Sequence, residues 1–281
     1  SFKLGTGNKM VVDETSCSTI TITDKLSKLF NKVDRDLLST TGNVLILRNK
    51  YKKDVCFKIT PELRIIIDRM KDYNTLTKGA TITLDGYDMF DVQGVKIFND
   101  SSFEYGGRVF LIGGDSVQSL NSELRGKIKI NGENVKELDF SALHPRLCAE
   151  QDGHTLPYDF DPYAITIEGY DPVVLRRLSK VALLIMVNIQ APTEKLAVHR
   201  ASLALSQDIS TMRDENEDRL QPTWYEEGKI PSKVIDTKEI MSCLYDRNYY
   251  MYEHFYSGSG IRLQNIDSKI VDYVLNHFTQ I

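Results

Sequence analysis

The sequence has no long apolar run. Its longest uninterrupted stretch of apolar residues, 181–187, is far shorter than the roughly 20 residues that a helix needs to cross a bilayer. Arg176, Arg177 and Lys180 stand shortly before this stretch, so it is typical of the buried side of a charged helix. We therefore expect no membrane-spanning segment and no membrane partner.

Cysteine is also scarce. The 281 residues include four cysteines, and no two of them form a Cys-x-x-Cys pair. Structural zinc sites use closely spaced cysteines and histidines, so the sequence argues against a site of this kind. Sparse cysteines fit a reducing compartment, and we expect free thiols at Cys17, Cys56, Cys148 and Cys243.

An excess of positive charge is missing as well. Lys and Arg together number 35, Asp and Glu 39, and the net charge is −4. This balance argues mildly against a nucleic-acid-binding protein, because phosphate contacts need Lys and Arg. The run 48–53 is a local basic exception and contains Tyr51. We favour a solvated loop for this run, with a phosphate contact as the alternative.

Hydrophobic periodicity and turn residues predict a mixed α and β chain. Helices are expected at 23–38, from 61 onward, and at 171–190, 193–206, 237–254 and 265–278, and strands at 44–47, 55–59, 81–84, 103–112, 127–130 and 135–140. The strands 127–130 and 135–140 should form a hairpin across Asn131-Gly132, which is the strongest short-range hairpin signal. Residues 208–231 are charged and contain proline, so we expect a loop there.

Asp139 stands at the end of the predicted strand 135–140, and a tight turn follows it. A carboxylate in this position can bind a divalent metal through its side chain, together with a neighbouring backbone carbonyl. Mg²⁺ is usually held by one or two protein carboxylates plus substrate phosphates. Taken alone the pattern is weak, because an Asp at the end of a strand is more often a turn residue or a helix cap.

Arg176 and Lys180 are spaced i, i+4 on the predicted helix 171–190, so both cations lie on one helix face. Leu184 and Asn188 continue the same row. Two cations on an otherwise apolar helix could hold a triphosphate and neutralise the charge that grows on the leaving pyrophosphate. A surface helix with salt bridges is the alternative, and for this segment alone it is the favoured one.

A third segment, 104–110, lies in the predicted strand 103–112 and contains Gly107 followed by Arg108. Glycine lets the backbone approach a ligand closely, and the adjacent Arg could bind a phosphate. A plain β-bulge is the competing interpretation.

Taken in order, these segments resemble the A-family polymerase superfamily. Asp139, Ser141 and Arg146 are similar to the Asp-x-Ser-x-x-x-x-Arg pattern of its motif A. Arg176 with Lys180 is similar to its motif B on the fingers helix.

The segment 104–110, Glu-x-x-Gly-Arg-Val-Phe, resembles the Asp-x-x-Gly-Arg element upstream of motif A in single-subunit phage and mitochondrial RNA polymerases. The resemblance implies an α+β fold, with a polymerase palm made of an antiparallel sheet and helices, plus helical fingers. It assigns 101–170 to the palm, 171–236 to the fingers and 237–281 to a helical return to the palm. Residues 1–100 form an N-terminal α/β region that the resemblance does not cover.

The resemblance also implies a role for each matched residue. Asp139 would bind both Mg²⁺ ions, and Phe140 would lend its backbone carbonyl. Arg176 and Lys180 would hold the incoming nucleoside triphosphate, with Lys180 as the acid that protonates pyrophosphate.

The implied reaction is template-directed nucleotidyl transfer by two metal ions. A DNA-dependent RNA polymerase of a phage or phage-like element, acting in the cytoplasm of the host cell, is the favoured form, and a DNA polymerase of the same superfamily is the alternative. The implied partners are a DNA template, the nascent nucleic acid and nucleoside triphosphates. Arg108 and Gly107 would contact the template or hybrid backbone.

Two positions depart from the family pattern, and both concern the nucleotide. His144 stands where DNA polymerases of this superfamily carry a Glu and where RNA polymerases usually have a small residue. Asn188 stands two turns after the motif B lysine, where related polymerases carry an aromatic residue that helps to sense the sugar. We include both among the residues expected to contact the nucleotide, and the choice between ribose and deoxyribose stays open.

A motif C element, His-Asp on a hairpin after the predicted helix 265–278, is not found up to Ile281. Asp267-Ser268 is superficially similar but lies within a helical pattern. Either the sequence is truncated, or a second polymerase subunit supplies the second catalytic Asp. In the latter case the chain is expected to be a polymerase-like subunit that is not active by itself.

An aromatic cluster lies between 245 and 256. Its members could stack nucleobases, although packing between helices is the commoner use of such residues. They are Tyr245, Tyr249, Tyr250, Tyr252, Phe255 and Tyr256.

Overall fold

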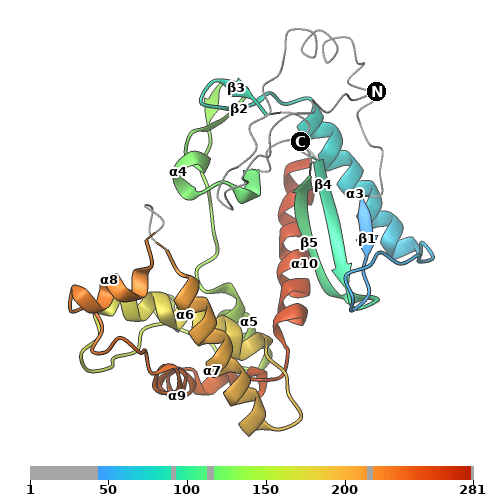
Figure 1. Cartoon of the computed structure of the whole chain (residues 1–281). Helices are drawn as coiled ribbons and strands as arrows, with labels where there is room; N and C mark the ends of the chain where they lie inside the picture. Colours follow the sequence, from blue (N-terminus) through green and yellow to red (C-terminus); the bar gives the residue numbers. More distant parts are fainter. Residues whose placement is uncertain (1–43, 90–92, 113–116, 214–217, 280–281) are drawn as a thin grey trace, which may run out of the picture. The chain divides into compact units, whose positions relative to one another are not determined.

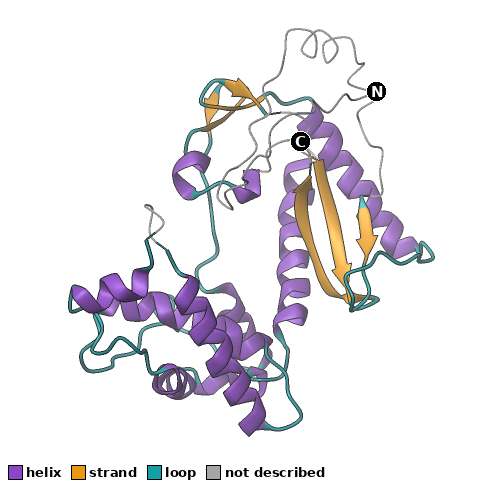
Figure 2. Cartoon of the chain, viewed as in Figure 1, coloured by secondary structure: helices purple, strands orange, loops and turns teal. Residues whose placement is uncertain are grey.

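The computed structural model of the chain describes residues 44–89, 93–112, 117–213 and 218–279. All of them belong to one unit, Asn43–Ile281. They fold into two small β-sheets and a series of helices (Figures 1 and 2), so the predicted α+β class is confirmed. The predicted helix 23–38 and Cys17 lie outside the described residues.

The first sheet has three strands in the order β1-β4-β5. β1 (Leu45–Leu47) pairs in parallel with β4 (Gln93–Asn99), and β4 forms an antiparallel hairpin with β5 (Ser102–Ile112). This sheet is therefore mixed, whereas the sequence resemblance implied an antiparallel one. The register shifts at Phe98, opposite glycines of β5. Gly107 there has φ +86°, and a Cβ on it would lie 2.6 Å from the Phe98 ring, so the bulge requires glycine.

Two helices pack against this sheet: α3 (Pro61–Lys78) contacts β4, and α10 (Gly260–Thr279) contacts β5 (Figure 1). α3 begins at Pro61 as predicted, and the Thr60 hydroxyl accepts a hydrogen bond from the Leu63 amide. The apolar face of α3 completes a small core with the sheet, made of Leu45, Leu47, Leu63, Ile67 and Phe98.

Lys96 of β4 is a buried charged side chain, only 1% exposed. Its ammonium donates to the Ser268 hydroxyl at 2.8 Å and forms an ion pair with Asp272, and both partners belong to α10. Burial lowers the pKa of Lys96, and the hydrogen bond and charge of Asp272 oppose that effect. A buried ion pair thus joins β4 to α10.

The second sheet has the strand order β3-β2-β6-β7 and consists of short antiparallel pairs. Its strands are β2 (Ile82–Leu84), β3 (Tyr87–Asp88), β6 (Ile128–Ile130) and β7 (Glu133–Asn134). The predicted turn at Asn131-Gly132 is confirmed, with φ of 52° and 83° at the two residues, as a type I′ turn requires. The short helix α4 (Ser122–Arg125) and the 3₁₀ turn η1 (Val117–Ser119) precede β6.

The predicted strand 135–140 is wrong. β7 ends at Asn134, and the segment after it is mostly exposed and has no described strand beside it. A strand needs a partner for its backbone groups, which alternation in the sequence does not provide. The predicted strand 55–59 is also wrong, since pairing beside β1 stops at the isolated Arg48–Asp54 bridge and the hydrogen bond from the Val55 amide to the Leu47 oxygen.

The second half of the chain is helical. Its elements are α5 (Leu143–Gln151), α6 (Pro172–Asn188), α7 (Glu194–Thr211), α8 (Leu220–Glu226), α9 (Thr237–Arg247) and the 3₁₀ segment η2 (Tyr249–His254). α6 begins as predicted, because the Asp171 carboxylate accepts from the amides of Val173 and Val174 at 3.0 Å each. The main core lies among these helices and includes Leu178, Met186, Ala201, Leu205, Ile240 and Leu244.

Three further boundaries differ from the predictions. Residues 208–231 are not a loop throughout, because α7 extends to Thr211 and α8 buries Leu220 and Trp224 on one face. The predicted helix 237–254 changes from α to 3₁₀ at the fully buried Asn248. α10 begins at Gly260, before the predicted start at 265.

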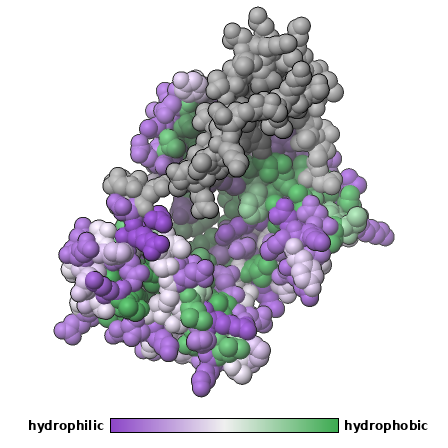
Figure 3. Space-filling view, in the orientation of Figure 1, coloured by the Kyte–Doolittle hydropathy of each residue, from purple (hydrophilic) through white to green (hydrophobic). Residues whose placement is uncertain are grey.

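No helix in the described part of the chain is long and apolar enough to cross a bilayer. On the face shown in Figure 3, hydrophilic side chains predominate and hydrophobic ones form separate patches.

Candidate functional site

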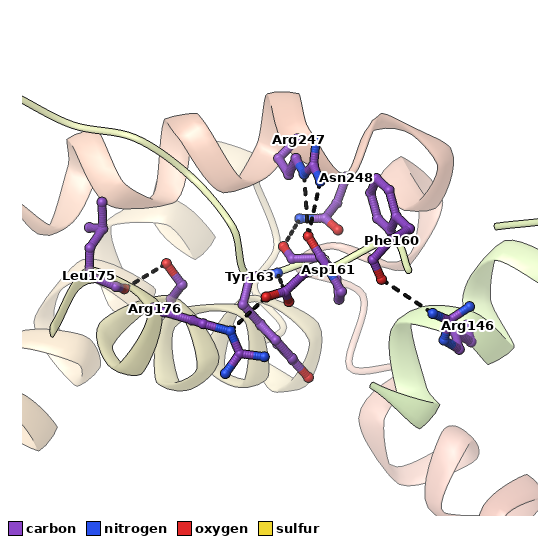
Figure 4. A network of polar contacts seen from close by, with 10 residues as sticks. Arg146, Phe160, Asp161, Tyr163, Leu175, Arg176, Arg247 and Asn248 are labelled. Atoms are coloured by element: carbon purple, nitrogen blue, oxygen red, sulfur yellow. Dashed lines mark hydrogen bonds and ion pairs between the residues drawn. The ribbon is translucent and has the colours of Figure 1, made fainter. Parts of the chain in front are cut away.

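The loop 157–163 precedes α6 and is fixed by side chains from other elements (Figure 4). Arg146 of α5 donates to three of its backbone oxygens at 2.8 to 3.2 Å, those of Pro157, Tyr158 and Phe160. Arg247 of α9 and the buried Asn248 donate to the next two backbone oxygens at 3.2 and 3.0 Å. The position of the loop is therefore determined by residues that precede and follow it in sequence.

Tyr163 lies at the end of this loop, beside the two predicted cations of α6. The guanidinium carbon of Arg176 lies 5.6 Å from the centre of its ring and Lys180 Nζ 5.7 Å, both within cation–π range. Asp161 completes the group, since Arg176 Nε donates to its Oδ2 at 2.6 Å and the Tyr163 amide donates to its Oδ1 at 3.0 Å. The predicted pair Arg176 and Lys180 thus shares one face and converges on one tyrosine.

The charges in this group shift two pKa values. Burial alone would raise the pKa of Asp161, but the hydrogen bond from Arg176, the Tyr163 amide and the charges of Arg176 and Lys180 lower it overall. Burial raises the pKa of Tyr163, and the charges of Asp161 and Asp139 raise it further, against the opposing effect of Arg176. Asp161 is therefore ionised and Tyr163 neutral at pH 7, and Asp139 is near enough for its charge to act at the Tyr163 ring.

Lys180 differs from Arg176 in its partners. Arg176 is bound to Asp161, whereas no carboxylate oxygen of the described residues lies within 4.0 Å of Lys180 Nζ. Lys180 is exposed, so its ammonium is available to an anion that enters from solvent.

Asp139 lies in the segment 135–140 between β7 and α5, and not at the end of a strand as predicted. Its side chain is exposed, and so is Phe140. The N-cap of α5 is Ala142, in the left-handed region at φ 51°, and no side chain caps this helix. Asp139 is therefore not a helix cap, and its carboxylate is available for another use.

Asp139 and the Phe140 carbonyl offer hard oxygen ligands. In the described ranges, no group of three or more His, Cys, Asp or Glu side chains is arranged to hold a metal ion. Mg²⁺ does not need such a group, because one or two carboxylates suffice when phosphate oxygens and water supply the other ligands. The donor set at Asp139 therefore fits a Mg²⁺ ion that binds together with a nucleotide.

A second polar cluster joins β5, α5 and α10. Arg108 donates to Asp267 Oδ2 through Nε at 2.9 Å and Nη2 at 2.7 Å, and its Nη2 lies 3.3 Å from His144 Nε2. Ser268, which follows Asp267 in α10, donates to the backbone oxygen of Gly107. The predicted residues Gly107, Arg108 and His144 thus lie together. Among the described residues, no hydrogen bond or ion pair joins them to the Tyr163 group.

Asp267 gives this second cluster a testable pH dependence. The neighbouring His144 ring, followed by Arg108, lowers the pKa of Asp267. A lowered folded-state pKa means that the ionised carboxylate stabilises the fold above the unfolded value of about 3.9, and that this stabilisation is lost as pH falls through the folded value. We expect Asp267→Asn to lower the free energy of unfolding by about 1–2 kcal/mol at neutral pH, and by progressively less below about pH 4.

Urea unfolding over a pH series measures this effect, with the exposed Asp88→Asn as the matched control. An equal loss at pH 2 and pH 7 would contradict the ionic role of Asp267.

Asn188 lies at the last turn of α6. Its Nδ2 donates to the Leu184 backbone oxygen at 2.8 Å, and its side chain lies against Gly260, where a Cβ would overlap it. A larger residue at position 260 would therefore require the Asn188 side chain to move. A contact between Asn188 and a nucleotide stays a prediction.

Sequence reasoning missed Asp161, Tyr163 and Asp267 as site residues. Asp161-Pro162-Tyr163 indicates only a turn, and Asp267-Ser268, although superficially similar to motif C, lies within a helical pattern and is not assigned to the site. All three come to their clusters through tertiary contacts that short-range patterns do not report.

Comparison with known proteins gives no relative: no family model matches the chain, and no curated protein or solved structure matches it.

Proposed function

We propose that this protein catalyses template-directed nucleotidyl transfer by a two-metal mechanism, as a polymerase of the A-family superfamily. The observation that supports it is the convergence of charged groups on Tyr163: the cations Arg176 and Lys180, the carboxylate Asp161, and the charge of Asp139. In this proposal β4, β5 and the segment 135–142 belong to the palm, and α6 is the fingers helix.

The two cations of α6 provide the triphosphate site. Lys180 is exposed and has no carboxylate partner in the described part of the chain, so a phosphate meets no competing ion pair there. Arg176 is paired with Asp161, and it would turn one edge of its guanidinium to the phosphate while its Nε stays bound. The Tyr163 ring lies beside both side chains and limits their movement, which lowers the entropy cost of binding.

Asp139 and the Phe140 carbonyl provide the metal ligands. When bound, Mg²⁺ lowers the pKa of a 3′-hydroxyl and neutralises charge on the triphosphate. The protein's own part is to hold the nucleotide between Asp139 and α6 and to donate a proton from Lys180 to the leaving pyrophosphate. The low pKa of Asp161 keeps an anion beside Arg176, which holds that side chain in place before the nucleotide enters.

Ribonucleoside triphosphates are the favoured substrates in this proposal, with deoxyribonucleotides as the alternative. His144 occupies the position that carries Glu in DNA polymerases of the superfamily, and the carboxylate beside it comes instead from Asp267 of α10 at 3.9 Å. A reaction with equimolar labelled NTPs and dNTPs on one primer–template decides between the two classes.

The test of the proposal is Mg²⁺-dependent incorporation of nucleotides on a primed DNA template. We expect Lys180→Ala to reduce the rate about 10²–10³-fold, as when one preorganised donor to developing charge is removed. Arg177→Gln is the matched control: it removes the neighbouring charge, whose guanidinium lies over the buried Trp224 ring 5.8 Å away, and should change the rate less than about twofold.

Equal losses in both variants would argue against a specific role of Lys180. Template binding without incorporation under any metal or nucleotide condition would favour a non-catalytic subunit that a second polymerase subunit completes.

A further inference from the structure

A cavity of about 290 Å³ opens beside the N-terminal turn of α7. Seven residues line it: Ala191, Glu194, Ala197, Tyr245, Tyr252, Phe255 and Tyr256. Four of them are aromatic and one is a carboxylate. The aromatic cluster predicted from the sequence thus forms part of a cavity wall.

The rings of this wall are stacked on one another. Tyr245 and Tyr252 lie face to face, with centroids 4.3 Å apart and planes inclined by 13°. Phe255 follows at 5.2 Å from Tyr245, and Tyr256 at 6.3 Å from Phe255. Phe255 is buried and fixes the base of the wall, whereas Tyr252 is 41% exposed. The cavity therefore offers π-faces that a ligand can reach.

The position of Tyr256 is set by its backbone. Tyr256 has φ 55°, in the left-handed region that a bulky residue rarely adopts, and its amide donates to the Met186 oxygen of α6 at 2.7 Å. The core contact thus holds the ring at the cavity in place without a ligand.

The surroundings of the cavity are anionic. Burial raises the pKa of Tyr245, and the charges of Glu194, Glu253 and Asp246 raise it further. Burial and the charge of Glu194 raise the pKa of Tyr256 to about 12. The described charged side chains that shift these two pKa values are all carboxylates, and carboxylates repel a phosphate.

No cation occupies this site in the described part of the chain. Several other aromatic rings of the protein have a Lys or Arg side chain over them. These rings are Tyr51, Tyr105, Phe160, Tyr163, Trp224 and Tyr225. Among the described residues, no Lys or Arg lies over any of the four rings of the cavity, and none forms an ion pair with Glu194. A carboxylate in the first turn of a helix interacts favourably with the helix dipole, which accounts for Glu194 at the start of α7. It does not account for the aromatic rings around Glu194.

We propose that this cavity binds an arginine side chain of a partner protein. A guanidinium is planar and weakly hydrated, so it can stack on the exposed tyrosine faces while its N–H groups donate to the Glu194 carboxylate. The aromatic faces and the anionic rim both favour a cation, and the small volume suits a single side chain. None of the residues that line the cavity is among the proposed catalytic groups, so the outcome of this test does not depend on the polymerase proposal.

The test uses the full chain, labelled with ¹³C in its tyrosine rings, and the blocked tripeptide Gly-Arg-Gly as the probe. We expect saturable shifts of the Tyr245, Tyr252 and Tyr256 resonances. The same tripeptide with citrulline, which is neutral and nearly isosteric, should bind at least about tenfold more weakly. Glu194→Gln should weaken binding of the arginine peptide about five- to tenfold.

Matched variants separate recognition from folding. Tyr245→Leu removes one ring face and should abolish binding, whereas Tyr245→Phe keeps the face and should retain it. The exposed residues Tyr273 and Glu226 provide controls, and Tyr273→Leu and Glu226→Gln should bind as the parent chain does. Equal binding of the arginine and citrulline peptides would overturn the proposal. Unchanged affinity in Glu194→Gln, or stronger shifts with adenosine monophosphate than with the peptide, would do so as well.

Discussion

Asp139→Asn is expected to abolish Mg²⁺-dependent nucleotide incorporation, with a loss of about 10³-fold or more. Asparagine keeps the size of the side chain but removes the charge that binds the metal, and metal binding contributes several kcal/mol to the stability of the transition state. Since 1.4 kcal/mol corresponds to tenfold in rate, a loss of this size follows directly. Single-turnover incorporation at saturating template, with and without Mg²⁺, measures it.

The fold should tolerate this change, because Asp139 is exposed and does not cap α5. Urea unfolding should therefore give the parent value within about 0.5 kcal/mol. The nearby exposed Asp159→Asn removes an equal charge from the loop 157–163 and serves as the control. Incorporation by Asp139→Asn at the parental rate would refute the assignment of Asp139 as the metal ligand.

Asp272→Ala is expected to lower the free energy of unfolding by about 3–5 kcal/mol, the range for breaking a buried ion pair on one side. The substitution leaves the Lys96 ammonium, 1% exposed, with only the Ser268 hydroxyl as a described side-chain partner. Burial lowers the pKa of Lys96, whereas the charge and hydrogen bond of Asp272 raise it. Without Asp272, the pKa of Lys96 should therefore be lower than in the parent chain. The unfolded chain then binds more protons than the folded one, and the loss of stability should shrink as pH rises toward 10.

Lys96→Met tests the same pair from the other side. It removes the buried charge and leaves the carboxylate of Asp272, which is 20% exposed and can be hydrated, so we expect a loss of about 1 kcal/mol or less. Adding Lys96→Met to Asp272→Ala should restore most of the lost stability. Additive losses in the double variant, measured by urea unfolding, would mean that the two side chains do not depend on each other.

Local signals in the sequence were sufficient for several elements. Asp171 followed by Pro172 fixes the start of α6, and Asn131-Gly132 fixes a type I′ turn, because each depends on dihedral angles and hydrogen bonds of adjacent residues. The strand expected at 135–140 failed because pairing depends on a neighbour. β7 ends at Asn134, beyond which no described strand accepts its backbone.

Some residues of the candidate site could likewise be predicted from local sequence patterns, and others could not. The i, i+4 spacing of Arg176 and Lys180 placed both on one face of α6, as the structure has them. Tyr163 and Asp161 could not be predicted, since their loop is positioned by Arg146 and Arg247. Arg146 itself, expected only as part of a motif, holds this loop through backbone oxygens.

α10 is anchored at several points along its length, among them the Lys96–Asp272 ion pair and the hydrogen bond from Ser268 to the Gly107 oxygen. Its first residue, Gly260, lies against Asn188 at the end of α6, and Asp267 further along binds Arg108 of β5. A helix of 20 residues is about 30 Å long and bends little. A displacement of the end of α6 would therefore move α10 as one body. Asp267 would move with the helix and would displace the Arg108 guanidinium that it binds.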